Sequence, residues 1–248
     1  MGFKWSEVQI LSPRFFSFPF AGSLYNNPMN LLIVIPVFNS WEALLPLIQS
    51  LKEIPADICI VNDGSDFIPD WAAFHPSAAL LHHGANKGKG AALRTGFSYA
   101  LEQGYEAVIT MDSDGQHEPR FFPSFTEALR KHPFVIGKRD FENPSMPLLR
   151  RFSNRMTSRI LSWLLRVSIE DAQCGYRALR REVLEVVETT APGFDMESEY
   201  IIRAVRKGFA PHFIPISTVY NGSVSAIKGI RDTRSFICLC FRALFKGL

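Results

Sequence analysis

Runs of apolar, β-branched residues alternate with helical patterns from residue 31 onward, and this alternation constrains the fold more than any other feature. Residues 31–35 are apolar at every position, as in a strand that is buried on both faces. Ser40 follows and can cap a helix that runs to about Lys52. Further strands are expected at residues 58–61, 79–82, 107–111 and 134–136, and a helix at 90–101. The alternation predicts a Rossmann-like α/β fold with a mostly parallel sheet flanked by helices.

The second half and the two ends of the chain are less regular. Helices are expected at residues 148–165 and 199–207, and a strand at 212–220. Residues 1–29 crowd aromatic side chains and prolines, which predicts an irregular arm; packing on the domain is favoured over contact with a membrane interface. Residues 228–248 are basic, with apolar side chains at helical spacing, and predict an amphipathic helix. This helix either packs on the domain or lies at a membrane surface. Between the two ends, residues 30–227 form a single domain.

The composition excludes several classes of protein. The chain has 248 residues, which suits one large domain, and 47% of them are apolar, which is enough for a core. Its 27 Lys and Arg against 24 Asp and Glu give a net charge of only +3, so no nucleic-acid partner is predicted. The four cysteines form no CxxC pair, which argues against a zinc site. With neither a secretory signal nor an apolar run long enough to span a bilayer, a cytoplasmic location is expected.

The strongest local signal for chemistry is Asp112-Ser-Asp114, directly after the strand expected at residues 107–111. Two carboxylates one residue apart at a strand end can share a hard cation, Mg²⁺ or Mn²⁺, that keeps positions open for phosphate oxygens. Gln116 offers a further oxygen and His117 a nitrogen. An isolated pair of this kind is more often a solvated acidic turn. Ligands bind beyond the carboxyl ends of parallel strands, however, so the polar ends of the neighbouring strands favour the metal site.

Two further motifs leave their roles open. Asp63, at the end of the second expected strand, can bind a nucleobase or ribose, or can simply form an Asx turn. Residues 84–90 are rich in glycine and lysine. They can start a helix whose N–H groups, with Lys87 or Lys89, face an anion. A plain turn at the start of a helix is at least as well supported.

Charged clusters mark the second half of the chain. Asp195, Glu197 and Glu199 lie near an expected helix start, where they can supply a general base or can merely complement the helix dipole. Residues 139–166 contain six arginines and no lysine. Such a local positive surface suits a phosphate group or an anionic lipid.

Six motifs follow one another in order along the chain. They are IVIPVFN (33–39), VNDGS (61–65), NKGKGA (86–91), DSDGQH (112–117), DAQCGYR (171–177) and ESE (197–199). In this order and at this spacing they resemble the motifs of inverting family 2 glycosyltransferases with the GT-A fold. The branch of dolichol- and polyprenyl-phosphate mannose and glucose synthases is the most similar. The resemblance covers about residues 31–236 and leaves the N-terminal arm unmatched.

The resemblance implies roles for individual residues. Contact with the sugar donor is implied for Pro36, Val37, Phe38, Ser40, Asp63, Lys89, Asp112, Ser113 and Asp114. A divalent metal, Mg or Mn, would be held by Asp112, Asp114 and Gln116. Contact with the acceptor is implied for Arg151, Arg177 and Ser225. Catalytic roles are implied for Asp114, Arg139, Glu197 and Glu199.

The implied function is inverting transfer of a sugar from a nucleotide-diphosphate sugar, of the GDP-mannose or UDP-glucose type, to polyprenyl phosphate. Peripheral contact with the inner face of the cytoplasmic membrane through the C-terminal segment is also expected. The alternatives are transfer to a hydroxyl acceptor in cell-envelope glycan or glycolipid synthesis, and a non-catalytic membrane adaptor that binds nucleotide sugars. Ser40 and Asn62 depart from the family, which usually has an acidic residue at the first position and often has one at the second. These departures loosen the donor assignment.

Overall fold

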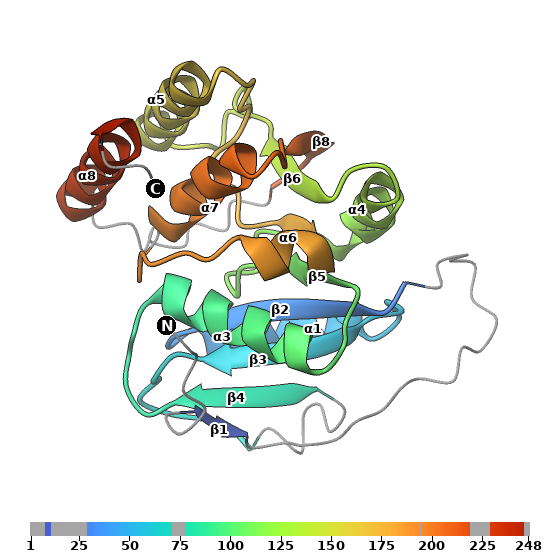
Figure 1. Ribbon diagram of the computed structural model, residues 1–248. Helices are drawn as coiled ribbons and strands as arrows, with labels where there is room; N and C mark the ends of the chain where they lie inside the picture. Colours follow the sequence, from blue (N-terminus) through green and yellow to red (C-terminus); the bar gives the residue numbers. More distant parts are fainter. Residues whose placement is uncertain (1–7, 11–28, 71–77, 194, 219–228, 246–248) are drawn as a thin grey trace.

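An eight-stranded sheet forms the centre of the protein in the computed structural model, which describes residues 8–10, 29–70, 78–193, 195–218 and 229–245 (Figure 1). From one edge to the other, its strands are β1 (Val8–Ile10), β4 (Ala79–His83), β3 (Asp57–Asn62), β2 (Leu31–Val37), β5 (Ala107–Thr110), β7 (Arg177–Arg180), β6 (Phe134–Arg139) and β8 (His212–Ile216). Strands β4, β3, β2 and β5 run parallel to one another, and β6 runs parallel to β8. The sheet is therefore mostly parallel, as the alternation of strands and helices predicted.

Helices flank the sheet and gather at one end of it. They are α1 (Trp41–Leu51), α3 (Lys89–Glu102), α4 (Phe122–Leu129) after the short 3-10 helix η2 (Pro119–Phe121), α5 (Leu148–Leu165), α6 (Arg181–Val186), α7 (Asp195–Arg206) and α8 (Gly229–Phe245). Figure 1 shows α5, α7 and α8 at the end of the molecule away from β1 and β4. Helix α7 packs against both α5 and α8.

The apolar strands form the centre of the core. Every residue of β2 is buried, because β2 lies between β3 and β5 with both of its faces covered. This explains why residues 31–35 include no polar side chain. Parallel pairing brings the carboxyl ends of β2, β3 and β5 to one rim of the sheet. The polar residues 38–40, 63–65 and 112–116 follow these strand ends, so the topology places the candidate site at that rim.

The structure differs from the sequence-based expectations at several points. The N-terminal arm contributes a strand, β1, which pairs antiparallel with β4. Strand β7 was not expected; it lies antiparallel between β5 and β6. Ser40 precedes α1 but makes no capping hydrogen bond through its side chain, and α1 continues through Pro46. The strand expected at residues 212–220 ends at Ile216.

The described part of the C-terminal segment is helical, as expected. In α8, Leu239 and Ala243 are buried, so this helix packs on the domain. Ile237, Phe241, Leu244 and Phe245 remain exposed on it. Among the described residues, no helix is both long enough and apolar enough to cross a bilayer.

Candidate active site

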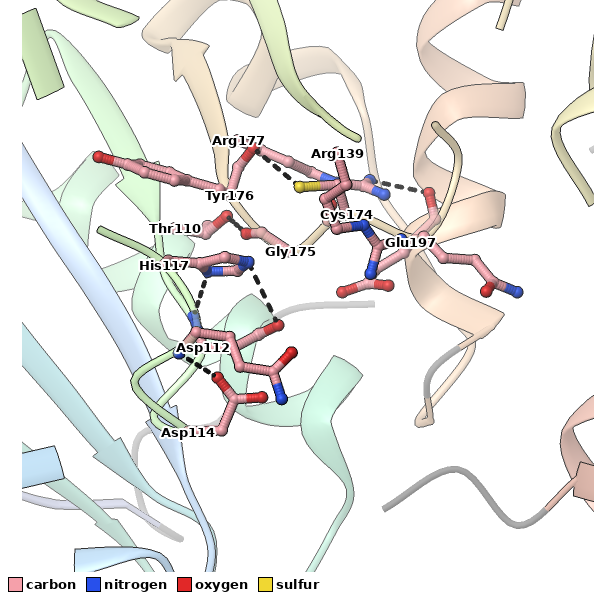
Figure 2. A network of polar contacts seen from close by, with 12 residues as sticks. Thr110, Asp112, Asp114, His117, Arg139, Cys174, Gly175, Tyr176, Arg177 and Glu197 are labelled. Carbon is pink, nitrogen blue, oxygen red and sulfur yellow. Dashed lines mark hydrogen bonds and ion pairs between the residues drawn. The ribbon is translucent and has the colours of Figure 1, made fainter. Parts of the chain in front are cut away.

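The loop that follows β5 is held in one conformation by hydrogen bonds from its own backbone. The N–H of Asp112 donates to Nδ1 of His117 over 3.1 Å, and the N–H of Gln116 donates to Oδ1 of Asp114 over 3.0 Å. The His117 side chain is buried, and burial lowers its pKa despite the nearby Asp112 and Asp114 carboxylates. Its ring is therefore neutral and supports the loop. Figure 2 shows Asp112, Asp114 and His117 grouped at this strand end.

Lys89, the first residue of α3, links this loop to α7. Its Nζ lies 2.6 Å from Oδ1 of Asp112 and 2.7 Å from Oε1 of Glu197. Burial would raise the pKa of Asp112, but the charge and hydrogen bond of the Lys89 ammonium outweigh burial and hold this pKa well below its ordinary value. The pKa of Asp114 is raised by burial and by the charge on Asp112. The two neighbouring carboxyl groups therefore differ in proton affinity, and Asp112 is the one that is kept ionised.

The donor atoms at this rim suit a hard divalent cation. The Asp112 and Asp114 carboxylates and the amide of buried Gln116 all come from one short loop. In the part of the chain that the structure describes, no three His, Cys, Asp or Glu side chains gather around a common point. Two carboxylates and an amide leave coordination positions open, as in sites where Mg²⁺ or Mn²⁺ also binds water and the phosphate oxygens of a substrate. The residues present fit such an ion.

A second loop, residues 171–177, is pressed against the first. A Cβ atom added to Gly175 would lie 2.4 Å from Oδ2 of Asp112, so only glycine allows this approach. Thr110, the last residue of β5, donates its hydroxyl to the carbonyl of Gly175 over 2.6 Å. The backbone at Gly175 therefore fixes the position of the Asp112 carboxylate from behind.

Two buried arginines hold the second loop in place. Arg139 forms a two-pronged ion pair with Asp171, with Nε 2.7 Å and Nη2 2.8 Å from the carboxylate oxygens. Both side chains are almost fully buried. Arg177 donates to the carbonyls of Ala172, Cys174 and Glu197. The loop and the start of α7 are thus joined through guanidinium groups, and Figure 2 shows Arg139, Arg177 and Glu197 close together.

Asp63 organises the loop before α3. Oδ1 of this carboxylate accepts from Nδ1 of His83 over 2.7 Å and from the N–H of Lys87 over 3.0 Å, and Oδ2 accepts from the N–H of Gly88 over 2.7 Å. Burial would raise the pKa of Asp63, but the bonds from His83, Lys87 and Gly88 lower it overall. The carboxylate is therefore ionised and secures the loop.

The glycine-rich loop at residues 84–90 uses its backbone N–H groups inside the protein. Those of Lys87 and Gly88 bind Asp63, and that of Gly90 donates to the carbonyl of Pro192 over 2.8 Å. Gly88 adopts φ +94°, which favours glycine. These contacts support a plain turn at the helix start over a phosphate-binding loop.

Glu197 and Glu199 lie one turn into α7 but have different surroundings. The Glu197 carboxylate faces Lys89 and the rim of the sheet. Glu199 is fully buried and accepts bonds from the N–H groups of Thr190 and Ala191 and from Arg203. Burial would raise the pKa of Glu199, but these bonds outweigh it and lower the pKa. Glu199 is thus bound to the backbone that precedes α7 and to Arg203, whereas Glu197 is the carboxylate nearer to Asp112.

The family is decided by a match along most of this sheet. The model of the family described as Glycosyl transferase family 2 matches residues 32–187. The chain belongs to glycosyl transferase family 2. It is therefore a glycosyltransferase, and the match spans the strand-end loops that carry Asp63, Asp112 and Asp114.

Two named relatives resemble the chain over most of its length. The "Undecaprenyl-phosphate mannosyltransferase" of Micrococcus luteus is 32% identical over 210 residues, which are 77% of this chain and 84% of that protein. The "Polyprenol monophosphomannose synthase" of Mycolicibacterium smegmatis is 29% identical over 214 residues, which are 80% and 81% of the two chains. These matches confirm the resemblance drawn from the six motifs.

Solved structures confirm the GT-A fold. The glucosyl-3-phosphoglycerate synthase from Mycobacterium tuberculosis, in complex with Mn²⁺, uridine diphosphate and phosphoglyceric acid, superposes with a TM-score of 0.65. The superposition covers 88% of this chain and 78% of that chain at 17% sequence identity. At this identity the likeness establishes the fold alone.

The structure brings most of the expected family 2 residues to the rim of the sheet. Pro36 and Val37 end β2, and Phe38 follows them with its side chain exposed. The hydroxyls of Ser40 and Ser113 lie 2.6 Å apart and tie the first strand-end loop to the Asp112 loop. Arg151 lies on α5, where Nη2 donates to the carbonyl of Asn143. Ser225 lies outside the described residues.

Some important residues were not found by the sequence analysis. His83, which donates to Asp63, was given no role, because the pair His82-His83 belongs to no recognisable motif. Asp171, the partner of Arg139, was noted only as the first letter of a motif. Burial is the signal that sets these residues apart, and burial of a charged side chain becomes visible only in the folded chain.

Proposed function

We propose that the protein transfers a sugar, with inversion at the anomeric carbon, from a nucleotide-diphosphate sugar to a polyprenyl phosphate. The observation that carries this proposal is the pair Asp112 and Asp114 at the carboxyl end of β5, next to Lys89 and Glu197. The names of these two relatives support mannose as the sugar and a polyprenyl phosphate as the acceptor. A GDP-mannose type of donor is accordingly favoured over a UDP-glucose type.

In this proposal a divalent metal, Mg²⁺ or Mn²⁺, is held by Asp112, Asp114 and Gln116. When bound, the ion neutralises negative charge on the diphosphate of the donor as that group leaves. Lys89 keeps Asp112 ionised and correctly placed, and Gly175 leaves room for its carboxylate. The nucleotide lies over the ends of β2 and β3, against Pro36, Val37, Phe38, Ser40, Asp63 and Ser113.

Asp63 supports the nucleotide site in a specific way. Its oxygens already accept three hydrogen bonds from His83, Lys87 and Gly88. A carboxylate has about four acceptor positions. One position is therefore left for a nucleobase N–H, while the other three keep the loop at residues 84–90 in place.

Helix α5 is the proposed source of the acceptor site. Nε of Arg151 and Nδ2 of Asn154 are buried and have no hydrogen-bond partner among the described residues. The two residues are three apart on α5 and so face the same side of the helix. Unpaired buried donors are costly, and a phosphate group would satisfy both. Arg177 positions the adjacent loop, and Ser225 is proposed as a further contact.

A phosphate acceptor needs little help from a base, because it is already an anion. Glu197 is the better placed of the two candidate carboxylates if a proton has to be accepted, since Glu199 is committed to Thr190, Ala191 and Arg203. Arg139 acts through Asp171 by fixing the loop at residues 171–177. Its proposed contribution is therefore to hold this loop in position next to Asp112.

The site is proposed to work at the inner face of the cytoplasmic membrane, where a polyprenyl phosphate would present its head group. Contact through α8 is part of this proposal, and the exposed Phe241 and Phe245 support it.

The test is transfer of radiolabelled sugar from GDP-mannose, UDP-glucose and UDP-N-acetylglucosamine to undecaprenyl phosphate in detergent, with Mg²⁺, with Mn²⁺ and with chelator. We expect transfer from one donor, dependent on metal and reduced at least about 100-fold in Asp114→Asn, in line with the loss of a group that stabilises transition-state charge. Glu127→Gln, which removes an exposed carboxylate on α4, is the matched control and should keep full activity.

Other outcomes point to the alternatives. Transfer to a hydroxyl acceptor that is lost in Glu197→Gln, with none to undecaprenyl phosphate, would replace the phosphate acceptor with a hydroxyl one. Nucleotide-sugar binding without transfer to any acceptor and without donor hydrolysis would identify a non-catalytic adaptor.

A further inference from the structure

Helix α5 exposes several large apolar residues and buries several polar ones. Asn154, Thr157 and Ser158 are buried together with Leu161. On the outside, Leu149 is 81% exposed, Phe152 61%, Met156 41% and Trp163 74%. These four residues, the outer stripe, follow at intervals of three, four and seven positions and so lie along one side of the helix. A helix of a globular protein ordinarily has the opposite arrangement.

The orientation of α5 is fixed by the active-site loop. Oγ of Ser158 accepts from the N–H of Ala172 over 3.0 Å, and Oγ1 of Thr157 accepts from the side chain of Gln173 over 3.2 Å. Both bonds tie the inner face of α5 to the loop at residues 171–177. Rotating the helix to bury the outer stripe would break these bonds. The exposure of the stripe is therefore built into the site.

The charge of α5 indicates what covers the outer stripe. The helix contains Arg150, Arg151, Arg155 and Arg159 and no acidic residue. Arg155 is paired with Glu142, and Arg151 donates to the carbonyl of Asn143, whereas Arg159 is exposed beside the outer stripe. Apolar and aromatic side chains next to an exposed arginine match the boundary between the acyl chains and anionic head groups of a bilayer. A protein surface without acidic residues would match only the apolar part of this pattern.

The neighbouring helix has a similar character. In α8, Ile237, Phe241, Leu244 and Phe245 are exposed, and α8 packs, like α5, on α7. Figure 1 shows α5 and α8 at the same end of the molecule. Two helices at the same end thus expose large apolar side chains.

We propose that the outer stripe of α5 inserts into the head-group region of an anionic bilayer, with Arg159 on the lipid phosphates. The inference assigns a docking surface to α5 in addition to the contact proposed for α8. It does not depend on the identity of the acceptor, and its test uses vesicles that contain no polyprenyl phosphate. Failure of the test would therefore leave the proposed reaction untouched.

The first experiment is sedimentation of the full chain with phosphatidylglycerol–phosphatidylcholine vesicles. The variant Phe152→Ser/Met156→Ser/Trp163→Ser should lower the partition coefficient at least about tenfold, because burying each large apolar side chain stabilises the bound state. The control is Phe67→Ser/Val186→Ser, which removes exposed apolar side chains away from α5 and should sediment like the wild type. Both variants should keep the wild-type melting temperature, since all the replaced side chains are exposed.

A second measurement locates the contact. Fluorescence of Trp163, taken as the difference between the wild type and W163F, should shift to shorter wavelength and become protected from acrylamide when vesicles are added. Arg159→Gln should weaken binding to anionic vesicles about fivefold, as for one basic residue near a charged surface, and should leave the weaker binding to neutral vesicles unchanged.

Three outcomes would overturn the inference. One is equal sedimentation of the wild type and the outer-stripe variant. Another is an unchanged Trp163 spectrum when vesicles are bound. The third is a dimer in sedimentation velocity without lipid that the outer-stripe variant converts to a monomer, because a second copy of the chain would then be the occupant of the stripe.

Discussion

The two halves of the sheet are held together by different forces. In the first half, strands β2, β3, β4 and β5 pair in parallel, and their buried positions are almost all apolar. In the second half, β7 and β6 are surrounded by buried charges, with Arg139 on Asp171 and Arg177 on three carbonyls. The first half forms an apolar platform. In the second half, hydrogen bonds and ion pairs position the loops and helices around β6 and β7. The proposed site lies where the halves meet, at Asp112 and Glu197, which Lys89 links.

Among the tests of this difference between the halves, the largest effect on stability is expected from the substitution Asp171→Ala. It leaves the buried Arg139 guanidinium without its partner and should reduce the free energy of unfolding by about 3–5 kcal/mol. Urea denaturation followed by circular dichroism measures the loss. Should Asp171→Ala prevent folding, the double variant Arg139→Met/Asp171→Leu is expected to restore much of the stability, because it removes both charges together. A loss below about 1 kcal/mol in the single variant would show that the ion pair does not hold this half.

The pH dependence of folding stability tests the same difference at Glu199. Its pKa is lowered in the folded protein, so its stabilisation is fully present above the unfolded value of about 4.3 and is lost as pH falls through the folded pKa. Glu199→Gln should lower stability at pH 7 by about 1–3 kcal/mol, since charged hydrogen bonds to Thr190, Ala191 and Arg203 are weakened. Denaturation curves should converge with those of the wild type once the pH falls below the folded pKa. A difference that persists unchanged at low pH would contradict the role of the charge.

The junction between the halves is tested by Gly175→Ala. The new Cβ would approach the Asp112 carboxylate to 2.4 Å, so the carboxylate has to move. We expect a stability loss of about 1–2 kcal/mol from overpacking, together with a clear loss of Mn²⁺ affinity measured by calorimetry. Gly84→Ala is the matched control, because a Cβ there meets no atom within 4 Å. Unchanged Mn²⁺ binding in Gly175→Ala would show that Gly175 has no role in the metal site.

The smallest effect is expected in the apolar half. Ile33→Val removes one buried methylene group from β2 and should cost about 1 kcal/mol, measured by the same denaturation experiment. Its effect on sugar transfer should be negligible, because Ile33 lies away from the strand ends. A large loss of activity would show that the platform itself controls the geometry of the site.

The accuracy of the sequence analysis also differs between the halves. The strands at 31–35, 58–61 and 107–111 and the residues at their ends were predicted from apolar runs, and their parallel pairing followed from the alternation with helices. The unexpected β7 lies in the second half, where Arg177 and Arg180 interrupt any apolar pattern. The cap expected from Ser40 was wrong, because its hydroxyl pairs with Ser113, 73 residues away.

The sequence alone determined the fold class, the rim that carries the site and the two carboxylates of the Asp112 loop. Apolar periodicity and strand-end motifs are local properties, and they persist whatever the rest of the chain does. Only the tertiary structure decided that Asp63 and Glu199 accept hydrogen bonds from the backbone of other loops. It also decided that Lys89 joins Asp112 to Glu197, and that α5 exposes large apolar side chains. The physical reason is that hydrogen bonds and burial depend on partners far away in the chain, and no pattern of neighbouring residues specifies which partner arrives.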